Sequence, residues 1–400
     1  MMRILHVIST MAPSSGGPTS ILAAMTAAQA TVGIQVEVCT TDRGNPSSDL
    51  LDVRLLRSFL NSAVRLHSFP TEVSGPLLSM AMRRWLKQHI TDYDLVHVHG
   101  MYRFPPTYAA WLARKRGMPY IIWPHGSLDP FLHKQSSRSV WLKRLWERWL
   151  DLPNLQAASA IHYTSEDERD RASFMRLHAP PIVVANGLDW DRFADLPAPG
   201  TFRERLGLDP QVPLILFLSR INFKKGLDLL IPAFAQVRMR HPDAILAIVG
   251  PDNEGYGARV RDWVREHGLD NVVLFVDKLE GNAVVQAYVD ADVFVLPSYS
   301  ENFGLVVAES LACGTPVVIS DQVNIHREVS NSGAGLVTRC DVVEIAESLS
   351  KLLSDPSLRQ SAGRAGRDLV QCKWTLDVMV RDLTEEYERA IARHRARERL

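Results

Sequence analysis

Two carboxylates eight positions apart, Glu301 and Glu309, stand in surroundings that favour ligand binding. Glu301 follows the apolar run 293–296, and Glu309 lies in a stretch of small apolar residues, 306–312, that is expected to be helical. A carboxylate in such surroundings is costly unless it is hydrogen-bonded, and ligand hydroxyls would supply the partners. The simpler interpretation is that Glu301 caps the helix and Glu309 is partly exposed.

Two further loops carry groups that suit phosphate. Arg220 and Lys225 follow the run 214–218 at the start of an expected helix, where an arginine fork and a lysine point charge suit a diphosphate. The alternative is a solvated basic loop. Gly16 and Gly17 precede another expected helix, so their backbone N–H groups could approach a phosphate, although a flexible loop is an equal interpretation. A G-x-G-x-x-G pattern is absent there, which argues against a nicotinamide or flavin cofactor.

One histidine is well placed for chemistry. His125 and Gly126 directly follow the apolar run 120–123, so the imidazole is expected at the end of a strand, where it can hydrogen-bond a substrate hydroxyl. The chain has 13 histidines, and a structural role is the alternative for any one of them.

Residues 133–150 form a basic, tryptophan-rich segment with helical spacing of its large apolar side chains. One interpretation is an amphipathic helix that docks on a sheet and leaves a solvated basic face. The other is a helix that engages anionic lipid or a lipid diphosphate acceptor. In that case the contact residues would include Lys143, Arg144, Trp146 and Arg148.

Short β-branched runs alternate with helical patterns along most of the chain, which predicts parallel β-α-β units. The alternation breaks at Asn186-Gly187 and at the Pro/Gly segment 196–200, then resumes. The sequence therefore predicts an α/β fold with two Rossmann-like domains, 1–187 and 188–374. A final helix, about 375–400, would extend the second domain or pack back on the first.

The composition is that of an ordinary globular chain with 45 basic and 45 acidic residues. Residues 1–187 nevertheless carry a net charge of +6, and the remainder −6. This balance argues against nucleic-acid binding but leaves room for a local anionic partner. Four cysteines without a C-x-x-C pair predict free thiols in a reducing compartment. No apolar run is long enough to span a membrane, so we expect a cytoplasmic protein, with peripheral contact at the inner membrane face as an option.

Together these motifs resemble the family 4 glycosyltransferases, which are retaining enzymes that use nucleotide-sugar donors. Glu301 and Glu309 match the Glu-x7-Glu motif of that family, and 311–318 matches the segment that follows it. Ser219-Arg220 with Lys225-Gly226 is similar to its donor motif, and 186–189 to its linker entry. The resemblance spans essentially the whole chain and is strongest over 214–320.

The resemblance implies the GT-B fold, in which two Rossmann-like domains with parallel sheets face each other across a cleft. The first domain would then bind the acceptor and the second the donor. Glu309 would bind the ribose hydroxyls and Glu301 the hydroxyls of the donor sugar. The loop from Asn302 through Phe303 and Gly304 to Leu305 would contribute backbone N–H groups to sugar or phosphate oxygens.

The same resemblance implies the remaining roles. Arg220 and Lys225 would neutralise the departing diphosphate with help from Gly16 and Gly17, and His125 would touch the donor sugar near its reacting carbon. No metal is expected, because the three Asp-x-Asp pairs either precede strands or lie in the linker, and preorganised cations and helix N-termini can stabilise the leaving diphosphate. No other cofactor is expected.

We therefore predict a retaining glycosyltransferase that moves a sugar, with a UDP-sugar as the preferred donor, to a glycan or lipid-linked acceptor. A nucleotide-sugar epimerase or a glycan phosphorylase could use the same architecture, since fold alone does not fix function. A third possibility is a non-catalytic sensor of nucleotide sugars.

Overall fold

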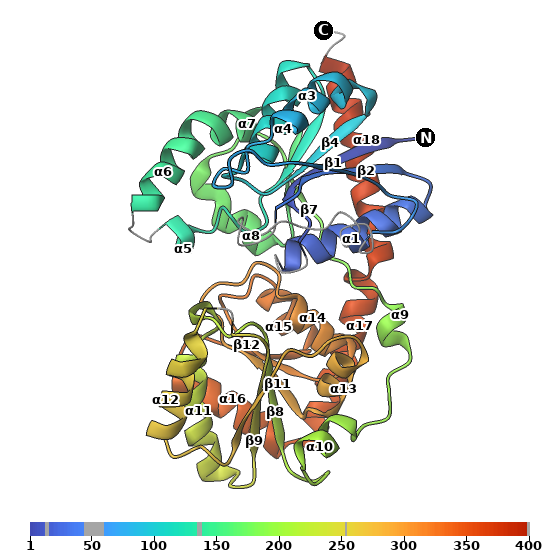
Figure 1. Cartoon of the computed structure of the whole chain (residues 1–400). Coiled ribbons are helices and arrows are strands. Elements are labelled where there is room, and N and C mark those ends of the chain that lie inside the picture. Colours follow the sequence, from blue (N-terminus) through green and yellow to red (C-terminus); the bar gives the residue numbers. More distant parts are fainter. Residues whose placement is uncertain (13–15, 44–59, 134–137, 253, 398–400) are drawn as a thin grey trace. The chain divides into compact units, whose positions relative to one another are not determined.

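A computed structural model describes the chain except for residues 13–15, 44–59, 134–137, 253 and 398–400. The chain divides into two compact units (Figure 1). The first is Met1–Gly187 with the C-terminal segment Leu376–Leu400, and the second is Leu188–Thr375. The C-terminal segment contains equal numbers of acidic and basic residues, so the first unit keeps the net charge of +6 of residues 1–187. Among the described helices, none is long and apolar enough to cross a membrane.

The first unit is built on a parallel sheet of seven strands in the order β3-β2-β1-β4-β5-β6-β7. Its strands are β1 Arg3–Thr10, β2 Gln35–Thr41, β3 Arg65–Phe69, β4 Leu95–His99, β5 Tyr120–Trp123, β6 Ala160–Tyr163 and β7 Pro181–Val183. Its helices are α1 Gly17–Thr31, α3 Met80–His89, α4 Phe104–Lys115, α5 Pro130–His133, α6 Arg138–Trp146, α7 Leu152–Ala157, α8 Glu166–Arg171 and α18 Leu376–Arg397. Single 3-10 turns lie at Ile90–Asp92 and Ala172–Met175, and a π-helical turn at Glu147–Asp151.

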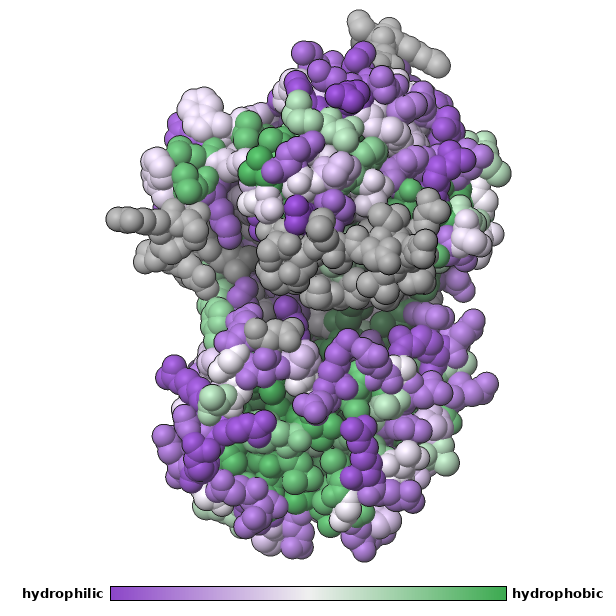
Figure 2. All heavy atoms as spheres, in the orientation of Figure 1, coloured by the Kyte–Doolittle hydropathy of each residue, from purple (hydrophilic) through white to green (hydrophobic). Residues whose placement is uncertain are grey.

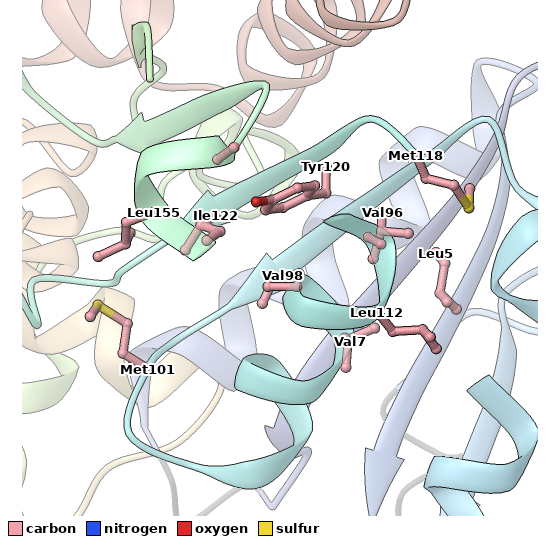
Figure 3. Packing of buried hydrophobic residues seen from close by; sticks show 14 of the residues in the cluster. Leu5, Val7, Val96, Val98, Met101, Leu112, Met118, Tyr120, Ile122 and Leu155 are labelled. Atoms are coloured by element: carbon pink, nitrogen blue, oxygen red, sulfur yellow. The ribbon is translucent and has the colours of Figure 1, made fainter. Parts of the chain in front are cut away.

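The two faces of this sheet differ in chemistry because side chains alternate along each strand. On the face covered by α4, the central strands contribute only apolar side chains and Tyr120 to a core cluster (Figure 3). That cluster includes Leu5, Val7, Val96, Val98, Ile122 and Leu155. The opposite face carries the alternate residues of the same strands and is covered by α1 and α18, which pack against each other. The C-terminal helix therefore belongs to the first unit.

The second unit contains a parallel sheet of six strands in the order β10-β9-β8-β11-β12-β13. The strands are β8 Leu214–Leu218, β9 Ile245–Val249, β10 Val273–Val276, β11 Val293–Leu296, β12 Val317–Ser320 and β13 Gly335–Thr338. The helices are α9 Asp191–Ala194, α10 Thr201–Leu206, α11 Leu227–Arg240, α12 Tyr256–Glu266, α13 Asn282–Asp290, α14 Leu305–Ala312, α15 His326–Ser332, α16 Val342–Ser354 and α17 Pro356–Lys373, with a 3-10 turn at Phe223–Lys225. Helices α11, α12 and α16 pack together, as do α13, α14 and α17 (Figure 1).

Both units reverse their strand order at one point, between β1 and β4 in the first and between β8 and β11 in the second. In open parallel sheets, ligands bind beyond the carboxyl ends of the strands at such a switch point. The predicted α/β fold with two Rossmann-like domains is confirmed. Short apolar or β-branched runs predict eleven of the thirteen described strands, and the two that they do not predict, β3 and β13, are edge strands.

Candidate active site

In the second unit, the loops that follow β8 and β11 meet at the switch point. The Lys225 ammonium, from the first loop, forms an ion pair with the Glu301 carboxylate, from the second. The side chains are 11% and 20% exposed, so the pair is shielded from most of the solvent without being sealed from it. The two residues that sequence reasoning assigned to a diphosphate and to sugar hydroxyls are therefore neighbours, and each neutralises the other.

The two loops are held together through the backbone. The Tyr299 N–H donates to the Lys224 carbonyl at 2.7 Å, and the Tyr299 hydroxyl donates to Asp228 at 2.7 Å. Gly226, with φ of +69°, approaches the Pro297 carbonyl so closely that a Cβ atom there would overlap the carbonyl oxygen. This position therefore requires glycine for its conformation and for its packing.

Glu301 is fixed by its own backbone as well as by Lys225. Its N–H donates to the Gln322 carbonyl at 3.1 Å, and its carbonyl accepts from the Asn324 N–H at 3.1 Å. The loop after β11 is thus stitched to the loop after β12. Gly304, with φ of +76°, then turns the chain into α14, whose N-terminus carries the partial positive charge of the helix.

The residues between Glu301 and α14 have different environments. Asn302 and Leu305 are half-buried. The Phe303 side chain is buried and packs edge-on against Trp374, with ring centroids 5.4 Å apart. The Phe303 side chain is thus used for packing, so the ligand contact that the resemblance implies would have to come from its backbone.

Glu309 lies half-buried on α14 and already has a partner within the chain. The Tyr288 hydroxyl donates to Glu309 Oε2 at 3.2 Å. Burial raises the pKa of the Glu309 carboxyl, while nearby Arg192 and the Tyr288 hydroxyl act in the opposite direction. The sequence predicts that ligand hydroxyls would supply the partners of Glu309, and the structure adds that Tyr288 supplies one partner from within the chain.

Arg220 differs from Lys225 in its setting. Its side chain is exposed, and within the described part of the chain it makes no ion pair. Its backbone segment is fixed, because the Ile221 N–H donates to the Pro251 carbonyl at 2.9 Å. Arg220 is therefore a cation at the edge of the switch point that is open to an anionic ligand.

The Asp-x-Asp pair at 290 and 292 has a structural role at the other end of the sheet. Asp290 accepts from the backbone N–H groups of Phe202 and Arg203 at 2.6 and 2.9 Å, and Asp292 pairs with the Arg203 guanidinium at 2.9 Å. These carboxylates hold α10 to the sheet and lie away from the loops that carry Lys225 and Glu301.

In the first unit, His125 sits in a strained turn after β5. Its φ is +50°, which is unusual for a residue with a side chain. Its ring stacks on Trp123, with centroids 4.1 Å apart, and its Nε2 lies 3.0 Å from His99 Nδ1. The next residue is held by Glu168, whose carboxylate accepts from the Gly126 N–H at 2.9 Å. Burial lowers the pKa of His125 to about 3, so the ring is neutral at physiological pH.

Gly16 and Gly17 lie where the sequence predicts, at the start of α1. Gly16 has φ of +82°, and its carbonyl accepts from the Thr19 and Ser20 N–H groups at 3.2 and 3.4 Å. Pro18 in the first turn is pre-set for helical φ. The three residues before Gly16 are outside the described part of the chain.

Sequence reasoning missed a group of buried histidines beside His125. His6, His97, His99 and His162 all lie on the sheet face covered by α1 and α18, and all are buried. The signal was available, because His97 and His99 stand two apart in the apolar run 95–99, which puts both on one face of a strand. The missed Glu168, which accepts from Thr164 as well as Gly126, left no comparable signal.

Three of these histidines could in principle hold a metal, since ring nitrogens of His6, His97 and His99 all lie within 4.8 Å of one another. The group contains no carboxylate, and each ring is at most 1% exposed. A divalent cation there would bury two positive charges without an anionic ligand, which is costly. Hydrogen bonds account better for the cluster: His6 pairs with His99 at 2.9 Å, and His97 Nδ1 lies 2.7 Å from the Tyr387 hydroxyl.

The basic, tryptophan-rich segment is largely exposed. Trp141, Leu142 and Trp149 are 63%, 62% and 69% exposed, and Lys143, Arg144 and Arg148 are exposed beside them. Around α6, Figure 2 shows apolar and hydrophilic side chains next to one another on the surface. The interpretation of a docked helix with a solvated basic face is therefore wrong in one respect, because Trp141 and Trp149 are exposed and do not dock on the sheet.

Trp146 does not share this exposure. It is half-buried, and its indole N–H donates to the Thr107 hydroxyl at 3.1 Å. Trp146 thus ties the segment to α4, and its role as a contact residue for a ligand or membrane stays a prediction. Asp151 reinforces the tie by accepting from the Thr107 hydroxyl at 2.5 Å and from the Tyr102 N–H at 3.0 Å.

Two protein-family models match the chain. The model described as "Glycosyl transferase 4-like domain" matches residues 16–187, and "Glycosyl transferases group 1" matches residues 200–369. The chain belongs to the family 4 glycosyltransferases. The two matches fall in the two units, so both halves of this glycosyltransferase carry the features of the family.

Individual relatives agree with this assignment. The glycosyltransferase is 29% identical over 366 residues to D-inositol 3-phosphate glycosyltransferase 2 of Catenulispora acidiphila. The matched region covers 86% of this chain and 83% of the relative. Sucrose-phosphate synthase from Thermosynechococcus elongatus matches with a TM-score of 0.75 at 22% identity, covering 98% of this chain and 100% of that one. A structure of Anabaena HepE in complex with UDP and glucose matches with a TM-score of 0.74 at 19% identity, covering 96% and 99%. These two structures share the GT-B fold with this chain.

Proposed function

We propose that this glycosyltransferase is a retaining enzyme that moves a sugar from a nucleotide-sugar donor, with UDP-sugars preferred, to a glycan or lipid-linked acceptor. The observation that carries the proposal is the ion pair between Lys225 and Glu301 at the switch point of the second unit. A cation and an anion placed side by side match a ligand that has a diphosphate next to a polyhydroxylated ring. The C1–O bond to the diphosphate would break, the acceptor hydroxyl oxygen would bond to C1 on the same face of the sugar, and the hydroxyl proton would pass to the leaving diphosphate.

The donor would exchange partners with this pair. Its diphosphate would take the ammonium of Lys225, with Arg220 and the N-terminus of α14 as further positive groups. The sugar hydroxyls would donate to the Glu301 carboxylate in place of Lys225, and the ribose hydroxyls would donate to Glu309. Because the positive groups are already in place, no metal is needed to stabilise the leaving diphosphate. We prefer a UDP-sugar because a structure of similar fold, that of Anabaena HepE, is a complex with UDP and glucose.

The first unit would supply the remaining contacts. His125 would hydrogen-bond the donor sugar near its reacting carbon, and the Gly16-Gly17 turn would approach the diphosphate. This unit carries the positive charge excess, which suits an acceptor that bears phosphate. The relative from Catenulispora acidiphila is named for a phosphorylated inositol, in line with an anionic acceptor.

We also place the enzyme at the inner face of the cytoplasmic membrane when its acceptor is lipid-linked. Support comes from α6 and the turn after it, where Trp141 and Trp149 are more than half exposed beside exposed Lys143 and Arg148. Tryptophan rings that lie at the headgroup level, with cations facing anionic lipid, are typical of a helix that lies on a membrane.

The proposal is tested by transfer of a radiolabelled sugar from UDP-glucose, UDP-galactose, UDP-N-acetylglucosamine or GDP-mannose to lipid and glycan acceptors, with and without EDTA. We expect acceptor-dependent release of the nucleotide that EDTA does not reduce and that Glu301→Gln lowers at least tenfold. Conversion of the donor without an acceptor would support an epimerase instead. Donor binding without transfer to any acceptor would support a sensor.

A further inference from the structure

A continuous line of hydrogen-bonded side chains leads from His125 into the core of the first unit. His125 Nε2 lies 3.0 Å from His99 Nδ1, and His99 Nε2 lies 2.9 Å from His6 Nδ1. His6 Nε2 lies 3.0 Å from the Gln29 Oε1. The Gln29 amide nitrogen then donates to the Tyr387 hydroxyl at 3.2 Å. The line thus crosses from the turn after β5, through β4 and β1, to helices α1 and α18.

The inner members of this line are shut off from water. His6, Gln29 and Tyr387 are completely buried, and His99 is 1% exposed. Water therefore does not compete for their donors and acceptors, and a mismatched polar group would cost about 1–3 kcal/mol. Each contact must pair one donor with one acceptor.

All three imidazoles carry a single proton at physiological pH. Burial lowers the pKa of His6 and of His125 to about 3, and it lowers the pKa of His99 well below the ordinary value. In a neutral imidazole one ring nitrogen donates and the other accepts, so a partner at one nitrogen fixes the role of the other.

With the Gln29 amide oriented so that its carbonyl oxygen faces His6, the role of every nitrogen follows. That oxygen can only accept, so His6 must carry its proton on Nε2 and present a bare Nδ1. His99 must in turn donate from Nε2 to His6 and present a bare Nδ1. By the same step, His125 donates from Nε2 to His99, which leaves its Nδ1 as an acceptor.

We propose that Gln29 is a positioning residue that fixes the tautomer of His125 through His99 and His6. The ring nitrogen that His125 can offer to a ligand is Nδ1, because Nε2 is committed to His99. In the tautomer set by Gln29, Nδ1 accepts a hydrogen bond and is suited to a substrate hydroxyl. The identity of that ligand rests on the function proposed above, whereas the control of the tautomer does not.

Residues other than Gln29 hold the His125 ring in place, so Gln29 controls its tautomer and not its position. Glu168 holds the Gly126 N–H, and the His125 ring is stacked on Trp123, so the position of the ring is set by other residues. Gln29 determines which nitrogen donates and which accepts at each contact from His6 to His125.

The tautomer is measured on the full chain labelled with 15N-histidine, by long-range 1H–15N correlation from ring carbons to ring nitrogens. The His125 signals are assigned by their loss in His125→Asn. We expect the Nε2–H form in the wild type. Gln29→Met keeps the volume but removes the acceptor, and should give a mixture or the Nδ1–H form at His125. Gln29→Glu keeps an oxygen facing His6 and should restore the Nε2–H form.

A matched control lies on the same helix. Thr26→Val also replaces a buried polar group of α1, one that donates to the Leu22 carbonyl at 2.8 Å, and should leave the His125 signals unchanged. An Nδ1–H form at His125 in the wild type, or unaltered signals in Gln29→Met, would overturn the proposal. A stoichiometric metal bound to His6 and His99 in the purified protein would overturn it too, because it would replace the hydrogen bond between them.

Turnover gives a second readout. The kcat for sugar transfer should fall in Gln29→Met by the fraction of His125 that leaves the Nε2–H form, and should recover in Gln29→Glu. An unchanged kcat beside a changed tautomer would refute the role of Gln29 in the reaction. A protein without transferase activity but with the predicted tautomers would count against the proposed function alone.

Discussion

Gly226 lies so close to Pro297 that adding one methyl group at Gly226 should push apart the two loops of the candidate donor site. In Gly226→Ala the new Cβ atom would overlap the Pro297 carbonyl oxygen and lie 2.9 Å from its carbon. Both atoms belong to the backbone and cannot rotate away, so the loop that carries Lys225 must move from the loop that carries Glu301. Donor binding should then weaken together with stability.

The chain offers a control with the same backbone conformation. Gly207 has φ of +68°, against +69° for Gly226, and a Cβ atom at Gly207 would meet nothing within 4 Å. Gly207→Ala should cost only the left-handed backbone penalty, about 1–2 kcal/mol. Gly226→Ala adds the overpacking cost of about 1–3 kcal/mol, giving about 2–5 kcal/mol in total.

Thermal unfolding and nucleotide titration separate the two effects. For a unit of this size each kcal/mol lowers Tm by about 2–4 °C, so Gly226→Ala should lose clearly more than Gly207→Ala. Calorimetric titration with UDP should show weaker binding in Gly226→Ala and unchanged binding in Gly207→Ala. Equal losses of Tm with unchanged UDP affinity in both variants would refute the packing argument.

Three other predictions follow from single contacts. Lys225→Met removes a charged hydrogen bond worth about 1.5–3 kcal/mol, so the Kd for a UDP-sugar should rise about 10- to 150-fold in calorimetric titration. Lys278→Met breaks an exposed ion pair in the same unit and should leave that Kd unchanged. Equal Kd values in the two variants would contradict the role of Lys225. Burial raises the pKa of Asp151 from 3.8 to about 6, so the folded state holds this proton more tightly and stability falls as pH rises through that window. Between pH 5 and 8 the wild type should lose about 1.4 kcal/mol that Asp151→Asn does not lose, and parallel urea-unfolding curves for the two proteins would rule this out. Trp149→Ala should reduce co-sedimentation with anionic vesicles without lowering Tm, whereas Met239→Ala, which removes an even more exposed side chain in the second unit, should leave co-sedimentation unchanged. Equal vesicle binding in both variants would remove the case for a membrane-facing segment.

The features that sequence predicts well are those written in short stretches of chain. The strands β1, β8 and β11 are apolar runs because both faces of a parallel sheet are buried. The edge strands β3 and β13 have fewer neighbours and carry polar residues, of which Arg65 is exposed, His67 half-buried and Thr338 buried, so the apolar signal is weak. The loops after β8 and β11 could be singled out because their charged residues directly follow such runs.

Contacts between distant segments lie beyond the reach of pattern reasoning. The hydrogen bond from Tyr288 to Glu309 joins two helices, and the hydrogen bond between Gln29 and Tyr387 joins residues 358 positions apart in the sequence. Trp146 and Trp149 are three positions apart in one segment, yet one is tied to Thr107 and the other is exposed. Spacing gives the face of a helix, whereas only the neighbouring elements determine what covers that face.

The central claim is that the second unit binds a nucleotide sugar through Lys225, Glu301 and Glu309. Calorimetric titration of UDP-glucose into the wild type and Glu309→Gln, at one pH and salt concentration and in EDTA, tests it most directly. The account predicts saturable binding at one site in the wild type and at least tenfold weaker binding in the variant, with unchanged Tm for the free protein. Equal affinity in both proteins would contradict it.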